Sequence, residues 1–311
     1  MYYPYFRGKQ FDLIAIRDTA ETLAANQFVP IIEPVRENLR GLRRALEVIC
    51  EAGGRAIVIV NPHHGDLAED GSPISDLLEE AFQELDTITA GVFLDNETSA
   101  AEAMQIYDDH ADHDPTFVHA GFRFAGQLAQ MLGAGVSETK HVFFERYCGD
   151  LYRNHYANAA HKVLIRDGFS RQRNADYPPI EKFSELHLTY AGMGMNGFGD
   201  FLIVGDEFTE GGGPAYAVAI HITFINGDDE DVMYVHHFLS NDRSTPTDPA
   251  GKFAQALENL IEHIDSDASQ VTETSAIEQF RELHEEEHFP GLGQVKKLSM
   301  IHHIQTLAAF L

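Results

Sequence analysis

The stretch Arg55-Ala-Ile-Val-Ile-Val-Asn61 indicates the fold class more clearly than any other part of the chain. Its apolar residues are consecutive and mostly β-branched, which is typical of a short strand buried on both faces. Gly53-Gly54 stand before it and end a helical pattern over residues 38–51. The local order of helix, turn and buried strand is that of a parallel α/β protein.

The same order of strand, polar loop and amphipathic helix repeats on both sides of this stretch. Apolar runs predict strands over residues 2–6, 28–33, 55–61, 87–95, 116–119, 141–146, 161–166 and 200–205. Apolar residues at helical spacing predict helices over 11–25, 38–51, 73–85, 99–110, 122–132, 149–158, 179–190 and 252–264. Eight such units favour a (β/α)8, TIM-like barrel with parallel strands. A doubly wound open sheet is the alternative, although no glycine-rich dinucleotide turn follows the first strand.

Two segments fall outside this repeat. Runs over 216–224 and 232–239, joined by a turn with Asn226-Gly227, predict an antiparallel hairpin inserted within 211–240. The tail is helical over 275–288, breaks at Pro290-Gly-Leu-Gly293 and resumes as a helix over 300–310. We therefore expect a barrel domain over 1–265 and a C-terminal helical extension over 266–311, packed on the barrel or on a partner.

The chain is strongly acidic, with 49 Asp and Glu residues against 22 Lys and Arg and a net charge of −27. Such a surface repels phosphate backbones, which disfavours binding to bulk nucleic acid or to anionic membranes. We find neither an apolar run of membrane-spanning length nor a secretory signal pattern. Cys50 and Cys148 have no metal or redox spacing and are expected to be reduced structural thiols. These features predict a cytoplasmic protein.

Polar residues end nearly every predicted strand, and in a (β/α)8 barrel these ends meet at the face where ligands bind. The ring consists of Arg7, Lys9, Glu33, Asn61, Asp95, Glu97, His119, Glu145, Arg146, Arg166, Asp167, Asp206 and Glu207. Our candidate catalytic residues are Glu33, Asp95, Glu145 and Lys9. Our candidate ligand-binding residues are Arg7, Asn61, His119, Arg166, Arg171 and Arg173.

Three carboxylates in this ring follow alternate strands. Side chains from alternate strands share a layer inside a barrel, so Glu33, Asp95 and Glu145 are expected close together. Their charges would then need protonation, pairing or a divalent cation such as Mg²⁺. The basic residues of the ring can neutralise them equally well, so a metal site and a buried ion-pair network both remain open.

A second subset points to an anion. Arg166, Arg171 and Arg173 lie within eight residues, and Gly211-Gly-Gly213 follows the eighth predicted strand. Barrel enzymes often bind phosphate between the loops after strands seven and eight, through backbone N–H groups and basic side chains. Arginine forks fit phosphate or carboxylate oxygens, so we expect a small anionic ligand here.

Three pairs of adjacent histidines invite a metal site: His63-His64, His236-His237 and His302-His303. Neighbouring side chains on a strand point to opposite faces, and on a helix they diverge by about 100°. We therefore expect surface or interface histidines instead of joint ligands.

Several longer stretches carry a family resemblance. They are Tyr3-Pro-Tyr-Phe-Arg-Gly-Lys-Gln-Phe-Asp-Leu13, Val29-Pro-Ile-Ile-Glu-Pro-Val35, Gly197-Phe-Gly-Asp-Phe-Leu-Ile-Val-Gly205, the segment from Gly211 to His221, and His236-His-Phe-Leu-Ser240. Over most of its length the chain resembles an uncharacterised bacterial family of similar size. Members are often encoded beside a small protein with a restriction-nuclease-like fold.

The chain is also distantly similar, over about a third of its length, to the phage "beta protein" family. That family shares the lysine-containing first strand and the Ile-Ile-Glu of the second, but it tends to have Lys-x-Gly-Glu where this chain has Lys9-Gln-Phe-Asp12. Together the resemblances imply a phage-defence or mobile-element setting and a nuclease-fold partner. They imply no catalytic residues.

Two functions follow from these observations. One is a barrel enzyme that binds a phosphorylated or nucleotide-like small molecule at the strand ends, with Mg²⁺ as a candidate cofactor. The alternative is a non-catalytic partner or sensor protein of a phage-defence or mobile-element operon. In that alternative the polar ring is an ion-pair network, and the hairpin and C-terminal helices form the interface.

Overall fold

The computed structural model describes residues 1–83, 85–211 and 216–311. These residues form two compact units, which are described one at a time. The first comprises Met1–Asp167 and Leu186–Phe201, and the second comprises Gly168–Glu185 and Leu202–Leu311. The segments expected from the sequence, 1–265 and 266–311, divide the chain differently.

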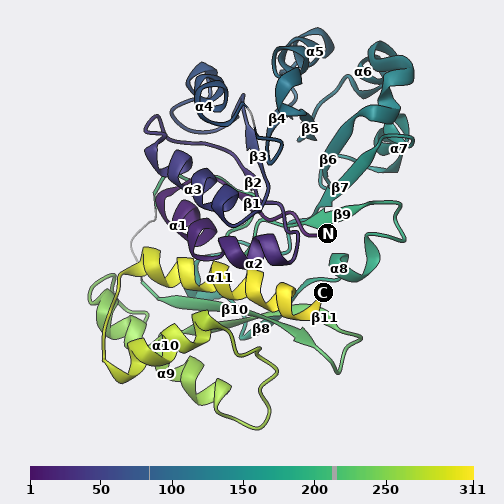
Figure 1. The fold of residues 1–311 in the computed structure, drawn as a ribbon. Helices are drawn as coiled ribbons and strands as arrows, with labels where there is room; N and C mark the ends of the chain where they lie inside the picture. The colour runs from purple at the N-terminus through teal and green to yellow at the C-terminus, as the bar shows by residue number, and fades with distance from the viewer. Residues whose placement is uncertain (84, 212–215) are drawn as a thin grey trace. The chain divides into compact units, whose positions relative to one another are not determined.

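An eight-stranded parallel sheet forms the centre of the first unit (Figure 1). In sheet order its strands are β1 (Tyr5–Phe6), β2 (Ile31–Ile32), β3 (Ala56–Ile59), β4 (Ile88–Leu94), β5 (Thr116–His119), β6 (Lys140–Phe144), β7 (His161–Ile165) and β9 (Gly197–Gly199). The N–H of Tyr3 donates to the carbonyl of Phe198 at 2.8 Å, so the two edges meet and the barrel is nearly closed. The predicted α/β class with eight parallel strands is confirmed.

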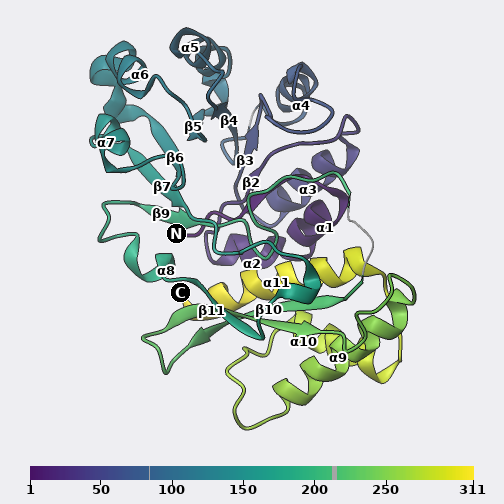
Figure 2. The ribbon, with the colours of Figure 1, turned by 180° about the vertical axis from the view of Figure 1, so that it is seen from behind.

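Helices alternate with these strands and lie outside them (Figure 2). They are α1 (Gln10–Asp18), α2 (Ala20–Ala25), α3 (Arg40–Glu51), α4 (Ser72–Phe82), α5 (Ala100–Asp109), α6 (Ala125–Leu132), α7 (Asp150–Arg153) and α8 (Leu186–Thr189). Local signals set their limits, as in α5, where Ser99 accepts a hydrogen bond from the N–H of Glu102 at 3.1 Å. Apolar residues at helical spacing, such as Leu42 and Ile49 of α3, supply the buried face.

Side chains that point inward, toward the barrel axis, fill its interior. Aliphatic residues from β2, β3, β5 and β7 form one part of this core cluster, and an aromatic group forms the other. The rings of Tyr5, Phe144 and Phe201 lie 5.1–5.2 Å apart, mostly edge to face. The interior is therefore packed, and polar chemistry is confined to the two ends of the strands.

The eighth barrel strand lies earlier in the chain than predicted. It is Gly197–Gly199, whereas the apolar run indicated 200–205. Glycines add nothing to a hydrophobic pattern, which hides this strand from the sequence. They are needed because a Cβ on Gly199 would lie 2.0 Å from the carbonyl oxygen of Tyr3, where the barrel edges meet.

The helix predicted over 179–190 is also wrong. Residues Ile180–Ser184 form β8, a strand of the second unit, and only Leu186–Thr189 are helical. β8 pairs with β11 (Val232–Leu239), about 50 residues further along the chain, with Tyr234 opposite Lys182. A pairing at that distance overrides the weak local helical pattern.

The second unit is a three-stranded antiparallel sheet covered by helices. β10 (Ala219–Asn226) and β11 form a hairpin, and the sheet order is β10-β11-β8. Its helices are α9 (Pro249–Ile264), α10 (Ser275–Glu285) and α11 (Leu292–Phe310). α9, expected to be the eighth barrel helix, packs instead against β10 and β11. Ile220, Phe253, Phe280 and Leu298 belong to the core cluster between sheet and helices.

Candidate functional site

Four of the predicted site residues continue the inward-facing rows of the barrel strands. Side chains alternate along a strand, and Tyr5, Ile31, Ile59 and Phe93 belong to the interior core. By the same alternation, the positions two residues later face the mouth of the barrel. These positions are Arg7, Glu33, Asn61 and Asp95. These four residues thus lie just after β1 to β4, on one side of the predicted ring.

Glu33 is the buried centre of this network, with no exposed surface. Its Oε2 accepts hydrogen bonds from the Tyr5 hydroxyl at 2.9 Å and from the Arg7 guanidinium. Its Oε1 accepts from the backbone N–H groups of His63 and His64, both at 3.0 Å, and from Nδ1 of His64 at 2.9 Å. Every lone pair that a carboxylate presents is therefore directed at a donor.

These donors keep Glu33 ionised. Burial by itself raises the pKa of this carboxyl, but the hydrogen bond from His64 and the positive charge of Arg7 outweigh it. The resulting pKa of Glu33 is about 2. A buried Arg7–Glu33 ion pair is thus a fixed part of the site.

Asp95 holds the second imidazole. Its Oδ1 accepts from the N–H groups of Glu97 and Thr98, both at 2.9 Å, and from the Thr98 hydroxyl at 2.8 Å. Its Oδ2 lies 2.8 Å from Nδ1 of His63. Although burial raises the pKa of Asp95, the hydrogen bonds from Glu97 and Thr98 lower it below its ordinary value. A charged acceptor therefore fixes the His63 ring, which also stacks on Phe93 with centroids 5.7 Å apart.

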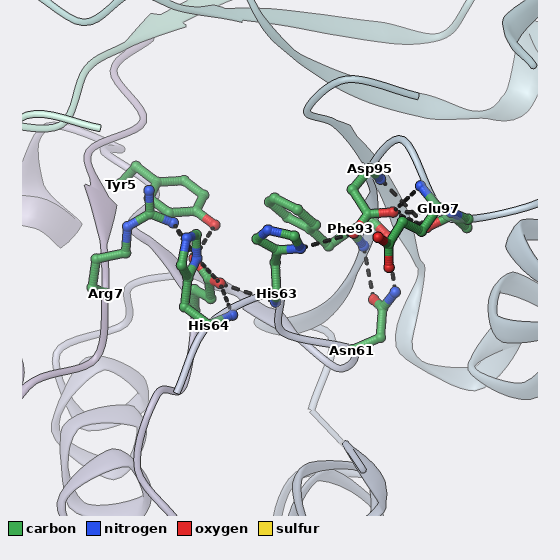
Figure 3. A network of polar contacts seen from close by, with 10 residues as sticks. Tyr5, Arg7, Asn61, His63, His64, Phe93, Asp95 and Glu97 are labelled. Atoms are coloured by element: carbon green, nitrogen blue, oxygen red, sulfur yellow. Dashed lines mark hydrogen bonds and ion pairs between the residues drawn. The ribbon is translucent and has the colours of Figure 1, made fainter. Parts of the chain in front are cut away.

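His63 and His64 are the residues that the sequence reasoning missed. Adjacent residues of a strand point to opposite faces, but β3 ends at Ile59 and both histidines lie in the following loop. Figure 3 shows His63 between His64 and Asp95, and the two imidazole centroids are 4.7 Å apart. The available signal was Pro62-His63-His64-Gly65 directly after the clearest buried strand, which is a position at the barrel mouth.

Asn61 has a structural role at this edge. Its Nδ2 donates to the carbonyl of Phe93 and its Oδ1 accepts from the N–H of Phe93, both at 2.8 Å. The amide therefore extends the pairing of β3 with β4 beyond the last ladder bond. Each polar end of the amide thus makes one hydrogen bond to the backbone of Phe93.

His119 points away from the barrel mouth. Val118 occupies the inward position on β5, so the next side chain faces the helices. Its Nδ1 lies 2.7 Å from the Tyr152 hydroxyl, and its Nε2 lies 2.9 Å from Nδ1 of His141. Burial, followed by the neighbouring His141, lowers the pKa of His119 well below its ordinary value. His119 is thus a neutral core histidine apart from the Glu33 network.

Glu145 and Arg166 form a separate pair. Nε and Nη2 of Arg166 donate to the two carboxylate oxygens of Glu145 at 2.6 and 2.8 Å. Phe144 takes the inward position on β6, so Glu145 does not share a layer with Glu33 and Asp95. The bidentate geometry satisfies both side chains where β6 and β7 end.

The other predicted anion-binding arginines belong to the second unit. Arg171 donates to the carbonyl of Glu207 at 3.1 Å and to the hydroxyl of Thr209 at 3.0 Å. Arg173 is exposed and pairs with Asp176 at 2.8 Å. The predicted glycine run extends outside the described residues, because only its first member, Gly211, is described. Arg171 therefore stabilises the loop that contains Glu207 and Thr209. It belongs to the second unit, whereas Arg166 belongs to the first.

Lys9 stands directly before α1. Its backbone N–H donates to the carboxylate of Asp12 at 3.3 Å, which is the helix-capping contact of that carboxylate. The side chain is half-buried. Lys9 lies two residues after Arg7, at the same end of β1 as the Glu33 network.

Three histidines of the two remaining pairs are buried in the second unit, and His236 is half-buried. His302 and His303 of α11 are fully buried, and Nδ1 of His303 lies 3.1 Å from the Thr223 hydroxyl. Nδ1 of His237 lies 2.7 Å from Nδ1 of His221 on the neighbouring strand. The sequence predicts surface or interface histidines, whereas His237, His302 and His303 lie in the interior of the unit. Each of these buried rings is hydrogen-bonded to a residue of another strand or helix. Such distant partners cannot be recognised in the sequence.

Within residues 1–83, 85–211 and 216–311, no three His, Cys, Asp or Glu side chains are grouped to hold a metal ion. No helix in the same part of the chain has the length and apolar character needed to cross a bilayer. No protein-family model, curated protein or solved structure matches the chain.

Proposed function

We propose that the protein is an enzyme with a TIM-like (β/α)8 barrel, and that it performs general acid–base chemistry on a small anionic molecule at the mouth formed by β1 to β4. The support comes from one arrangement, the pair of His63 and Asp95. A half-exposed imidazole is held through Nδ1 by a carboxylate and through its face by Phe93. That arrangement directs Nε2 away from the carboxylate, as a proton-transferring histidine requires.

In this proposal His63 accepts a proton from the substrate at Nε2 and later returns it. Asp95 accepts the hydrogen bond from Nδ1–H throughout, which fixes the tautomer and stabilises the imidazolium after transfer. Glu33 and Arg7 are positioning residues, because the carboxylate orders the loop through the N–H groups of His63 and His64. Such preorganisation keeps the reacting atoms in register.

The exposure of the network favours an anionic substrate. The His63 and His64 side chains are 43% and 25% exposed, whereas Glu33 is 0% exposed and Asp95 is 17% exposed. The two imidazole rings, which can donate hydrogen bonds, thus face solvent, and the carboxylates lie behind them. Phosphorylated and nucleotide-like molecules, the class expected from the sequence, fit this arrangement of donors.

A ligand screen tests the proposal. The thermal unfolding of the wild-type protein is measured with phosphorylated and carboxylate metabolites. Each measurement is made with and without MgCl₂, because Mg²⁺ is the candidate cofactor predicted from the sequence. A ligand at one hundred times its Kd adds about 2.7 kcal/mol of stability, which gives a clear shift in Tm. Compounds that bind are then incubated with the protein, and turnover is followed by NMR. We expect a compound that both binds and is converted.

Two variants assign the activity to His63. His63→Gln should lower turnover about 10²- to 10⁴-fold, the usual contribution of a general acid–base group. His288→Gln, at an exposed position on the second unit, is the matched control and should leave turnover unchanged. Turnover that survives His63→Gln contradicts the proposal. A screen without binders favours the non-catalytic partner function, which co-purification with a nuclease-fold neighbour then tests.

A further inference from the structure

The first unit has a cavity at the opposite pole of its barrel. Its volume is about 890 Å³, within the range of small-molecule sites. Its lining includes Tyr3, Ile57, Thr116, Lys140 and His161, which stand at or near the amino ends of their strands. The Glu33–His63 network lies after the carboxyl ends, so this cavity is a second location, independent of the proposed function.

The floor of the cavity is apolar. Val29, Ile57, Val142 and Val163 line it, and all four are buried members of the barrel core. The cavity thus enters the bottom layer of the barrel and offers a surface for an apolar group. Beside this floor, the Tyr3 hydroxyl lies 2.7 Å from Nε2 of His161.

One wall carries a polar atom that needs a partner. His113 lines the cavity and is only 8% exposed, yet its Nδ1 has no hydrogen-bond partner in the part of the chain that the structure describes. Buried polar atoms are normally satisfied, because leaving one unpaired costs stability. The atom itself has almost no exposed surface, so His113 forms part of the cavity wall, and the ligand contacts are assigned to the rim charges.

The rim presents charges of both signs. Arg55, Asp86 and Asp112 line the cavity before β3, β4 and β5, and none of them forms an ion pair with another described residue. The strands that follow Arg55 and Asp86 are hydrogen-bonded neighbours, since the N–H of Ala56 donates to Thr87 at 3.0 Å. Lys140, further around the rim, is already paired with Asp114.

We propose that this cavity binds a small zwitterion with an apolar group, the chemical class of the hydrophobic amino acids. Arg55 would hold the carboxylate, and Asp86 or Asp112 would hold the ammonium group. The apolar group would rest on the valines of the floor. A site at this pole is remote from the barrel mouth, so its ligand acts as a regulator or stabiliser and is not consumed.

Calorimetric titration of the full chain with three matched probes tests the charge requirement. L-leucine carries both charges, 4-methylpentanoate lacks the ammonium group and 3-methylbutylamine lacks the carboxylate. We expect saturable binding of L-leucine and at least tenfold weaker binding of each analogue. Equal binding of 4-methylpentanoate would overturn the zwitterion in favour of an organic anion. Absence of binding by L-leucine would overturn the site.

Variants then locate the binding. Arg55→Gln and the double variant Asp86→Asn/Asp112→Asn change exposed side chains, so the fold is retained, and each should weaken L-leucine binding at least tenfold. Arg44→Gln, on the exposed side of α3, is the matched control and should bind as the wild type does. His63→Gln should also bind L-leucine normally, which separates this site from the barrel mouth. Binding unchanged in both rim variants refutes the location.

Discussion

Nδ1 of His64 lies 2.9 Å from Oε1 of Glu33, a carboxylate without exposed surface, while the adjacent His63 directs its own Nδ1 to Asp95. Two neighbouring residues of one loop thus bind carboxylates from two different strand ends. The loop after β3 therefore links the ends of β2 and β4, the two strands that pair with β3. Glu33 fixes the conformation of this loop through the N–H groups of both histidines and through Nδ1 of His64.

Replacing Glu33 by Gln should destabilise the protein strongly. The variant leaves the Arg7 guanidinium buried without its counter-charge, and breaking a buried pair in this way costs about 3–5 kcal/mol. Urea denaturation measures the free energy of unfolding. Glu47→Gln is the control, because its pair with Arg43 is exposed and such pairs contribute about 0–1 kcal/mol. A loss below about 1 kcal/mol for Glu33→Gln would show that the buried pair is not a structural element.

The stability of the protein should fall steadily as the pH is lowered below neutrality. Burial and the charge of Lys162 lower the pKa of His141 from 6.5 to about 3, so between these values the unfolded chain binds a proton that the folded chain excludes. Glu33 adds a second loss as the pH falls from 4.5 toward 2, because its unfolded form is protonated first.

Each such group contributes a slope of about 1.4 kcal/mol per pH unit inside its window. Urea denaturation at pH 7.5, 6.0 and 5.0 tests the histidine part separately from the carboxylate. His141→Gln should reduce the slope over this range by about 1.4 kcal/mol per pH unit, because His119, His221 and His302 are also buried with lowered pKa values and keep contributing. The exposed His288→Gln should leave the slope unchanged. A wild-type stability that is constant from pH 7.5 to 5.0 is incompatible with a buried neutral His141.

The barrel could be predicted because its strands are continuously apolar and its helices amphipathic. The eighth strand and β8 could not. Gly197 and Gly199 have no side chains to form a pattern, and β8 owes its conformation to pairing with β11. Periodicity reports burial within one element, whereas these two strands depend on close approach and on a distant partner.

The site was predicted in part for a similar reason. Strand alternation placed Glu33 and Asp95 at the mouth, and the structure brings both into one loop network. His119 and Glu145 were included because they also end strands, but Val118 and Phe144 occupy the inward positions there. Shifting the expected inward position by one residue moves a side chain to the other face of the sheet.

Asn61→Asp should destabilise the junction of β3 and β4. The wild-type Nδ2 donates to the carbonyl of Phe93, and a carboxylate oxygen in its place would face that carbonyl without a proton. An unsatisfied group of this kind costs about 1–3 kcal/mol in the free energy of unfolding. Asn38→Asp is the matched control, since the exposed Asn38 only accepts a hydrogen bond, from the N–H of Arg40. Equal stability of the two variants would argue against the bridging role of Asn61.

Gly199→Ala should disrupt the closure of the barrel. The added Cβ would lie 2.0 Å from the carbonyl oxygen of Tyr3 and 2.4 Å from Cδ1 of Ile165. Overpacking of this kind costs about 1–3 kcal/mol or more, because backbone must move. The control is Gly149→Ala, where a Cβ would meet no atom within 4 Å. Thermal unfolding of both variants separates a steric effect from the general effect of replacing glycine. Similar Tm values for the two variants would contradict the close approach of Gly199 to Tyr3.

Asp95→Asn should separate the chemistry of the site from its stability. Asparagine keeps the Oδ1 acceptor for Glu97 and Thr98, so the free energy of unfolding should change by less than about 1 kcal/mol. Its amide group, however, donates toward Nδ1 of His63 in place of accepting from it. The ring then carries its proton on Nε2 and cannot accept one from a substrate there, so turnover should fall about 10²- to 10⁴-fold. Asp95→Ala should lose turnover and also the hydrogen bonds to the N–H groups of Glu97 and Thr98. Wild-type turnover in Asp95→Asn would exclude His63 as the general base.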